Sequence, residues 1–291
     1  MWVVLTFHLV IPIVGQFDKP TEWANIVKDL DVVIDTIHTP EAKRLSGEIL
    51  AAVSNAAREL RPEGAPKLSY IYTSGTWLHG DNRNDVVTDT TPVRSPPELV
   101  AWRPGREQLV INDKVLNGLV IRPGLVYGRS ASLLAPFFKS ASEGTVWFPG
   151  KPGGRFALVH TDDLADLYVR AAEKAAICGG LIFDAVNEHT ESVDDWLTAL
   201  VKVSGAQKPY EYREPATCMF SALLDFLLES CWLCIICSIP CSPRNDHTSQ
   251  ALPCEDSAWL AAKQAELRGW ASHLLCCMES YPVISSSKKF S

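Results

Sequence analysis

The first 177 residues of this 291-residue chain contain no cysteine, and all nine cysteines lie at or beyond Cys178. An odd number of cysteines in the C-terminal part does not form the disulfide framework of a small secreted domain. A basic excess is also lacking, because 27 Lys and Arg stand against 34 Asp and Glu, which gives a net charge of -7. We therefore expect no nucleic-acid partner and a reduced, cytoplasmic location.

Long apolar runs are also scarce. Residues 1–14 are apolar, but no Lys or Arg precedes them and no small-residue cleavage site follows, so we interpret them as a strand and not as a signal peptide. The uncharged run 230–243 is shorter than the ~20 residues that span a bilayer. No membrane span is predicted.

Apolar segments with polar exits alternate with amphipathic segments along the N-terminal two thirds of the chain. The composition, 47% hydrophobic and 21% charged, is typical of a soluble globular protein with one large domain or two smaller ones. Strands that are apolar throughout and separated by helices predict a mostly parallel, doubly wound α/β sheet. The predicted strands are 31–36, 67–73, 118–123 and 181–185, and the helices between the first three are 40–60 and 106–115.

Further helices are predicted from caps and periodicity. Thr21 is a candidate N-cap for a helix over 22–30, and the cluster Thr161, Asp162 and Asp163 for a helix through Ala175. A helix is also expected over 135–143, and another from Ser192 to Val203; a short strand at 146–148 and a glycine-rich loop at 150–154 lie between them. Helix 40–60 has one apolar side, formed by Leu45, Ile49, Leu50, Val53 and Ala57.

The stretch LSYIYTSGTWLHG, residues 68–80, ends a buried strand with hydroxyl side chains. Tyr70, Ile71 and Tyr72 favour a strand, and the hydroxyls of Thr73, Ser74 and Thr76 follow at its exit. Open parallel sheets bind ligands outside the carboxyl ends of their strands. The sequence therefore predicts a binding site at this edge.

The segments DVVIDT, YIYTSGTWLHG, GLVIRPGLVYGR and FALVHTDDLADLYVRAAE occur in an order that resembles the extended short-chain dehydrogenase/reductase superfamily. Within it, the chain is similar to the atypical NAD-dependent epimerase/dehydratase branch over roughly residues 14–205. The resemblance implies a Rossmann-like domain that binds NAD or NADP, a smaller C-terminal substrate domain and a small-molecule substrate. It leaves open whether the protein forms a homodimer.

The resemblance also implies site residues. Six positions fall near the cofactor: Thr36, His38, Thr73, Arg122, Pro123 and Gly124. The usual catalytic hydroxyl position falls on Gly75, which leaves Ser74 and Thr76 as stand-ins. A strand end remains an alternative explanation for Arg122 and Pro123, and a helix cap for Asp162 and Asp163. No metal ligand is implied.

Two departures from the family pattern bear on activity. No G-x-x-G-x-x-G turn occurs, so we expect the chain to lack the N-terminal glycine-rich portion that approaches the pyrophosphate. The catalytic Tyr and Lys positions fall on Trp102 and Arg106, and an indole is no general acid at neutral pH. Arg106 is a candidate for catalysis through a phosphate or carboxylate, or an ordinary exposed helix arginine.

The predicted organisation has four parts. Residues 1–130 form a partial Rossmann-like domain, 131–215 the substrate domain with returning Rossmann elements, 216–251 a cysteine-rich apolar insert, and 252–291 a C-terminal helix and tail. Four cysteines between 231 and 241 match a C-x2-C-x2-C-x3-C iron–sulfur spacing, but their bulky apolar neighbours favour a hydrophobic helix.

The sequence thus favours an NAD(P)-dependent oxidoreductase or epimerase acting on a small carbonyl or sugar-like compound. A non-catalytic dinucleotide sensor and a truncated, inactive relative remain as alternatives, because fold does not fix activity.

Overall fold

The computed structural model describes residues 13–213 except 14, 38, 83–85 and 130–131. The strand expected at the N-terminus, His38, the cysteine-rich insert and the C-terminal helix lie outside the described residues, wholly or nearly so. The chain divides into two compact units: unit 1 comprises Met1–Ala131 and Phe156–Thr190, and unit 2 comprises Ser132–Arg155 and Glu191–Ser291.

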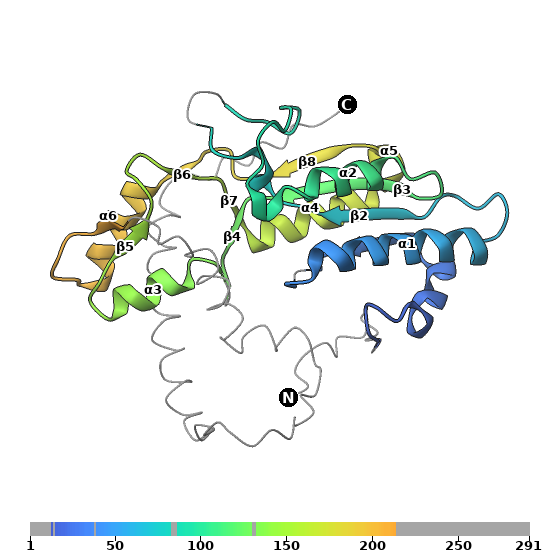
Figure 1. Cartoon of the computed structure of the whole chain (residues 1–291), viewed down its shortest axis with the longest axis horizontal. Helices are drawn as coiled ribbons and strands as arrows, with labels where there is room; N and C mark the ends of the chain where they lie inside the picture. Colours follow the sequence, from blue (N-terminus) through green and yellow to red (C-terminus); the bar gives the residue numbers. More distant parts are fainter. Residues whose placement is uncertain (1–12, 14, 38, 83–85, 130–131, 214–291) are drawn as a thin grey trace, which may run out of the picture. The chain divides into compact units, whose positions relative to one another are not determined.

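A four-stranded parallel sheet forms the centre of unit 1 (Figure 1). Its strands lie in the order β1-β2-β3-β8, and every neighbouring pair is parallel. This arrangement confirms the predicted doubly wound α/β class. The strands are β1 (Val32–Asp35), β2 (Ser69–Thr73), β3 (Asn117–Pro123) and β8 (Ile182–Ala185), and a short parallel pair adds β4 (Leu125–Tyr127) and β7 (Leu158–His160).

Helices cover both faces of this sheet, and β2 shows the period-two alternation that such a sheet requires. Tyr70 and Tyr72 lie in one core cluster with residues of helix α1 (Ala42–Leu60). Ile71 lies in the other cluster with Ala171 of helix α4 (Thr161–Glu173). The predicted apolar side of helix 40–60 is confirmed, since all five of its residues are buried.

The segment expected as a helix capped by Thr21 is instead two 3-10 helices, η1 (Pro20–Glu22) and η2 (Ala24–Asp29). Lys19 takes the N-cap position and Pro20 the first helical position, where the fixed φ of proline suits a helix start. The Thr21 prediction was therefore wrong, because the proline begins the turn before Thr21. Two further 3-10 helices are η3 (Thr76–His79) and η4 (Glu98–Val100).

Two other helix boundaries differ from the sequence prediction. Helix α2 spans Arg103–Ile111 instead of 106–115, because the Asp113 carboxylate accepts the backbone N–H groups of Val115 and Leu116 and holds them outside the helix. Helix α4 is capped by the His160 ring, which accepts from the N–H of Asp162. It ends at Glu173, and a separate short helix, α5 (Ala175–Cys178), follows.

The described part of unit 2 packs two helices against short strands. These are α3 (Ala135–Ser142), β5 (Trp147–Pro149), α6 (Val193–Ser204) and β10 (Glu211–Arg213), with β5 and β10 parallel. Phe137, Phe148 and Trp196 form mutual ring contacts in its interior. Ser192 caps α6 as predicted, by accepting from the N–H of Asp195. The two-residue strands β6 (Arg155–Phe156) and β9 (Glu191–Ser192) lie where the chain passes between units.

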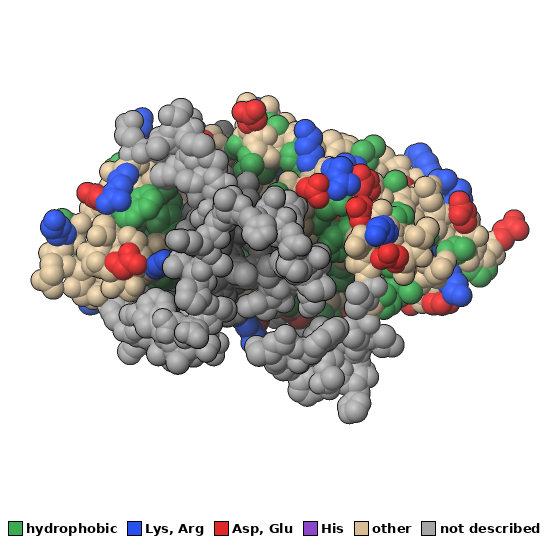
Figure 2. Space-filling model, turned by 60° about the horizontal axis from the view of Figure 1, so that its bottom comes forward, with side chains coloured by type: hydrophobic (Ala, Val, Ile, Leu, Met, Phe, Trp, Pro, Cys, Tyr) green, Lys and Arg blue, Asp and Glu red, His purple; other side chains and the backbone are tan. Residues whose placement is uncertain are grey.

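On the face shown in Figure 2, basic and acidic side chains of the described residues are interspersed. None of the helices in the described part of the chain combines the length and the apolar character needed to cross a membrane.

Candidate functional site

The carboxyl ends of β1, β2 and β3 meet at one edge of the sheet, because the three strands are parallel and in register. The N–H of Ser74 donates to the carbonyl of Ile121 at 2.8 Å, which extends the β2–β3 pairing by one residue. The Thr76 hydroxyl donates to the carbonyl of Pro123 at 3.4 Å. The structure therefore brings the predicted hydroxyl turn beside the predicted Arg-Pro-Gly segment.

Ser74 carries a buried hydroxyl with no hydrogen-bond partner among the described residues. The residue is only 8% exposed. Leaving a buried hydroxyl unpaired costs about 1–3 kcal/mol. Beside it, Gly75 has an extended backbone, and an added Cβ would meet only the carbonyl of Pro123, at 3.9 Å. An unsatisfied buried donor, beside a glycine that has room for a Cβ, is a candidate partner for a ligand oxygen.

Thr73 is already paired, because its hydroxyl lies 2.6 Å from the hydroxyl of Tyr168 on α4. Burial raises the pKa of Tyr168 to about 12, so this phenol keeps its proton at neutral pH. Tyr168 thus anchors α4 to the end of β2, and the predicted cofactor contact of Thr73 stays a prediction.

The end of β1 carries a buried carboxylate, Asp35, directly before the exposed Thr36. The Asp35 oxygens accept from the N–H of Ile37 at 3.0 Å and from the hydroxyl of Tyr70 at 2.8 Å. Burial raises the pKa of Asp35, and the two hydrogen bonds oppose that shift. Asp35 therefore fixes the turn on which Thr36 stands.

Arg122, predicted beside the cofactor, lies in a buried ion network (4% exposed). Its guanidinium donates to Glu107 of α2 through Nε at 3.0 Å and Nη2 at 2.7 Å. Its Nη1 lies 3.5 Å from Asp184 of β8, and the other Asp184 oxygen lies 2.9 Å from His79 Nε2. Two carboxylates thus engage the guanidinium that the sequence assigned to a ligand, and the ligand contact stays a prediction.

Sequence reasoning missed Glu107 and Asp184 as partners of Arg122, and His79 as a partner of Asp184. The available signal was a charged side chain inside each of two apolar strands, GLVIRP and LIFDA. Buried charges are rarely left unpaired, so two such strands in one parallel sheet point to each other. Close packing explains the glycine at position 124, because a Cβ there would collide with the backbone of Ala157.

Three side chains at the start of α2 make defined contacts. Arg106 donates to the carbonyl of Lys43 in the first turn of α1. The Trp102 indole donates to the carbonyl of Leu99. Arg103, which sequence reasoning missed, reaches the end of β2: its Nη1 lies 3.3 Å from both the Tyr72 hydroxyl and the carbonyl of Thr73. The catalytic assignment of Arg106 stays a prediction.

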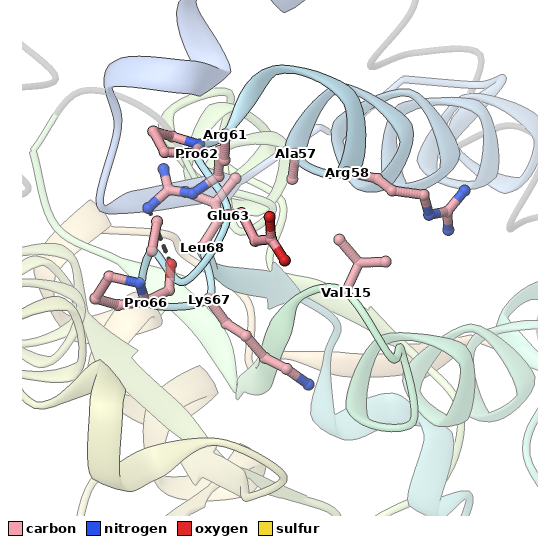
Figure 3. A pocket seen from close by; sticks show the side chains of 10 residues that line it. Ala57, Arg58, Arg61, Pro62, Glu63, Pro66, Lys67, Leu68 and Val115 are labelled. Atoms are coloured by element: carbon pink, nitrogen blue, oxygen red, sulfur yellow. Dashed lines mark hydrogen bonds between the residues drawn. The ribbon is translucent and has the colours of Figure 1, made fainter.

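A cavity of about 320 Å³ lies at the opposite, amino edge of the sheet, beside Leu68 before β2 and Val115 before β3 (Figure 3). In the close-up, the Glu63 carboxylate points into the hollow, while the Arg61 guanidinium turns toward Pro66. We place the candidate site at the carboxyl edge instead, because that edge holds the unpaired Ser74 hydroxyl and the predicted residues.

No family model and no curated protein matches this chain. Solved structures do match. They include dTDP-glucose 4,6-dehydratase from Bacillus anthracis in complex with NAD, with a TM-score of 0.59 and 12% identity over 69% of this chain and 67% of that one. RMD from Pseudomonas aeruginosa, complexed with NADPH, gives 0.54 and 12% over 70% and 76%. UDP-glucuronic acid 4-epimerase from Bacillus cereus, in complex with UDP-glucuronic acid and NAD, gives 0.53 and 18% over 66% and 65%.

At such low identities, the TM-scores establish a shared fold and nothing more. The Rossmann-like α/β architecture that the sequence motifs imply is therefore confirmed on two grounds, the parallel sheet itself and its likeness to these dehydratase and epimerase structures.

Proposed function

We propose that this chain binds NAD(H) or NADP(H) at the carboxyl edge of β1, β2 and β3 and acts as an oxidoreductase or epimerase on a small carbonyl or sugar-like compound. The unpaired, buried Ser74 hydroxyl at the end of the central strand carries the proposal. Solved proteins that share the fold are complexed with NAD, NADPH or a nucleotide sugar, which supports this ligand class.

The described residues fit one half of such a cofactor better than the other. Ser74 and Thr76, beside the small residue Gly75, form a polar rim that suits a nicotinamide ring and a substrate oxygen. The sequence has no glycine-rich turn of the kind that holds a pyrophosphate in this fold.

In this proposal, the cofactor supplies or accepts a hydride when it is bound. Ser74 donates a hydrogen bond to the substrate oxygen, and Thr76 fixes the backbone that presents Ser74. Thr36, Thr73, Pro123 and Gly124 would line the cofactor side of the edge, as the family resemblance implies.

Trp102 favours a second candidate, a dinucleotide sensor without catalysis. Its indole N–H is already bonded to the carbonyl of Leu99, and an indole transfers no proton at neutral pH. A sensor would bind the cofactor and show no turnover with any carbonyl compound.

Calorimetric titration of the purified full chain with NADH and with NADPH tests the binding step. Absence of binding at millimolar cofactor would eliminate both the enzyme and the sensor. If binding occurs, oxidation of the reduced nicotinamide is followed with a panel of aldehydes, ketones and nucleotide sugars.

The comparison of Ser74→Ala with Thr36→Ala assigns the hydroxyl role. We expect Ser74→Ala to lower kcat by about 10²-fold, a loss in the range seen for a positioned oxyanion donor. Thr36→Ala changes an exposed hydroxyl at the neighbouring strand end and should affect cofactor affinity more than kcat. Equal kcat in wild type and Ser74→Ala contradicts the assigned role.

A further inference from the structure

Arg103 is a cation at the carboxyl edge whose charge no carboxylate neutralises. Its half-buried guanidinium donates through Nη1 to the Tyr72 hydroxyl and to the carbonyl of Thr73, both at 3.3 Å. Burial raises the pKa of Tyr72, so that acceptor is a neutral phenol. Across the described ranges, no Asp or Glu oxygen lies within ion-pair distance of Arg103.

Three other arginines of unit 1 pair with carboxylates: Arg122 with two of them, Arg129 with Asp162 and Arg170 with Asp166. Arg61 and Arg106 resemble Arg103 in bonding to backbone carbonyls, but they do so away from the end of β2. The charge of Asp35 acts on Arg103 only at longer range. Both Asp35 oxygens accept their hydrogen bonds from other groups, the N–H of Ile37 and the hydroxyl of Tyr70. Among the residues that the structure describes, Arg103 is thus a guanidinium without a carboxylate counter-ion.

The geometry leaves most of the guanidinium fork unused. In the part of the chain that the structure describes, Nε and Nη2 of Arg103 have no protein acceptor, while the guanidinium carbon lies 4.8 Å from the centre of the Trp102 ring. The two Nη1 contacts and the stacking hold the group in place. A rigid guanidinium with two free donor groups matches the two oxygens of a carboxylate or phosphate.

Two neighbouring features add to this preference for an anion. Arg103 is the first residue of α2, and no side chain caps that end, so the backbone N–H groups of Arg103 and Gly105 add partial positive charge. Ser74, directly after the carbonyl that Arg103 binds, has the buried hydroxyl without a partner. Both features favour negative charge or an oxygen acceptor at the same strand end.

We propose that Arg103 binds an anionic group, a phosphate or a carboxylate, of the ligand that occupies the carboxyl edge. This inference rests on the proposed function, because it assigns one group of the ligand of that same site. It moves the anion contact from Arg106, which the sequence suggested, to Arg103. The anion belongs either to the cofactor or to the substrate.

The test titrates inorganic phosphate against the full chain without cofactor, with sodium chloride at matched ionic strength as the blank. The indole N–H signal of Trp102 in the ¹⁵N–¹H NMR spectrum, assigned by its loss in Trp102→Phe, reports on the stacked guanidinium. We expect a saturable shift with phosphate. Arg103→Met should weaken phosphate binding at least about tenfold, as the loss of a charged hydrogen bond predicts.

Arg103→Lys keeps a positive charge and serves as the control for misfolding of Arg103→Met. We expect Arg103→Lys to retain part of the phosphate affinity. Arg106→Met is the matched variant on the same helix. Because the Arg106 guanidinium donates to the Lys43 carbonyl and lies against Gly47, we expect the change to alter the phosphate affinity less than about twofold. An equal shift with chloride, no saturable shift, or a larger loss in Arg106→Met than in Arg103→Met overturns the proposal.

A competition experiment identifies the source of the anion. Phosphate that weakens NADH or NADPH binding marks a cofactor phosphate, and simultaneous binding of both marks an anionic substrate group. Because the phosphate titration needs no cofactor, it separates the two proposals. Failure of cofactor binding refutes the proposed function, and failure of the phosphate response refutes the role of Arg103.

Discussion

Asp35 shows how a single buried carboxylate can shape the candidate site. It is 4% exposed, and burial raises its pKa although the N–H of Ile37 and the hydroxyl of Tyr70 both stabilise its ionised form. The folded chain therefore holds the Asp35 proton at pH values where the unfolded chain has released it. Asp35 lowers stability as pH rises from about 4, the value for an unfolded Asp, through its raised folded pKa.

Asp35→Asn should remove this pH dependence. The amide keeps an oxygen for the Ile37 N–H, and its NH2 group donates to the Tyr70 oxygen. The bond to Tyr70 is thus reversed in direction while the desolvated charge disappears. We expect the free energy of unfolding at pH 7 to equal or exceed that of the wild type, with a smaller fall between pH 4 and pH 7. Urea unfolding at several pH values measures both quantities.

The matched control is Asp31→Asn, at an exposed position just before the same strand. Its unfolding free energy should follow the wild-type pH curve. A loss of more than about 1 kcal/mol at pH 7 in Asp35→Asn, together with an unchanged pH slope, would show that the charged carboxylate stabilises the strand end.

At the scale of helices and strands, the effect of replacing a glycine on stability depends on what packs against it. Gly118 is the second residue of β3 and packs against α2. A Cβ at this position would overlap the carbonyl of Val110 on α2. Gly105 lies in the exposed first half of α2, with nothing within 4 Å of an added Cβ. The same substitution should therefore have opposite effects at two sites on one helix–strand pair.

We expect Gly105→Ala to stabilise the chain by about 0.5–1 kcal/mol, because alanine is the better helix former. Gly118→Ala should destabilise it by about 1–3 kcal/mol, because the helix and strand must separate. Thermal unfolding of both variants measures the difference. Two changes of the same sign would show that α2 does not pack on β3 as described.

Sequence patterns predicted the central strands and the long helix, because continuous apolar runs and a 3.6-residue period depend on burial alone. They failed at helix ends. Thr161 looked like a cap, but its hydroxyl donates to the carbonyl of Tyr127, and His160 caps the helix instead. Residues far apart in the sequence decide such ends, so local pattern could not find them.

At the scale of the whole chain, the edge of the sheet was predictable but its side-chain pairing was not. Neighbouring parallel strands have their carboxyl ends at the same edge of the sheet. The sequence alone therefore predicted that the turn with Ser74 lies near Pro123, as the structure shows. Arg103 and Arg106 differ by three positions on one helix, and only packing shows that Arg103 reaches the end of β2 while Arg106 lies against Gly47 and the Lys43 carbonyl of α1. The family resemblance placed Arg106 at the catalytic Lys position, and the contacts at the end of β2 belong to Arg103.

The ion network of Glu107, Arg122, Asp184 and His79 joins segments over a hundred positions apart and ties α2, β3, β8 and η3 together at that edge. Removing one partner of a buried ion pair leaves the other charge buried and unpaired. We therefore expect Glu107→Leu to lower the free energy of unfolding by about 3–5 kcal/mol. Replacing both partners in Glu107→Leu/Arg122→Met leaves Asp184 with His79, and the double variant should lose less than the sum of the single losses.

A double-mutant cycle by urea unfolding measures this coupling, and the exposed pair Asp166 and Arg170 on α4 provides its matched control. Those side chains are 59% and 72% exposed, so their coupling should be no more than about 1 kcal/mol. Additive losses at Glu107 and Arg122 would mean that each residue stabilises the chain through separate contacts. Strong coupling would show that the network holds α2 in place, and with it the Arg103 that α2 presents to the strand ends.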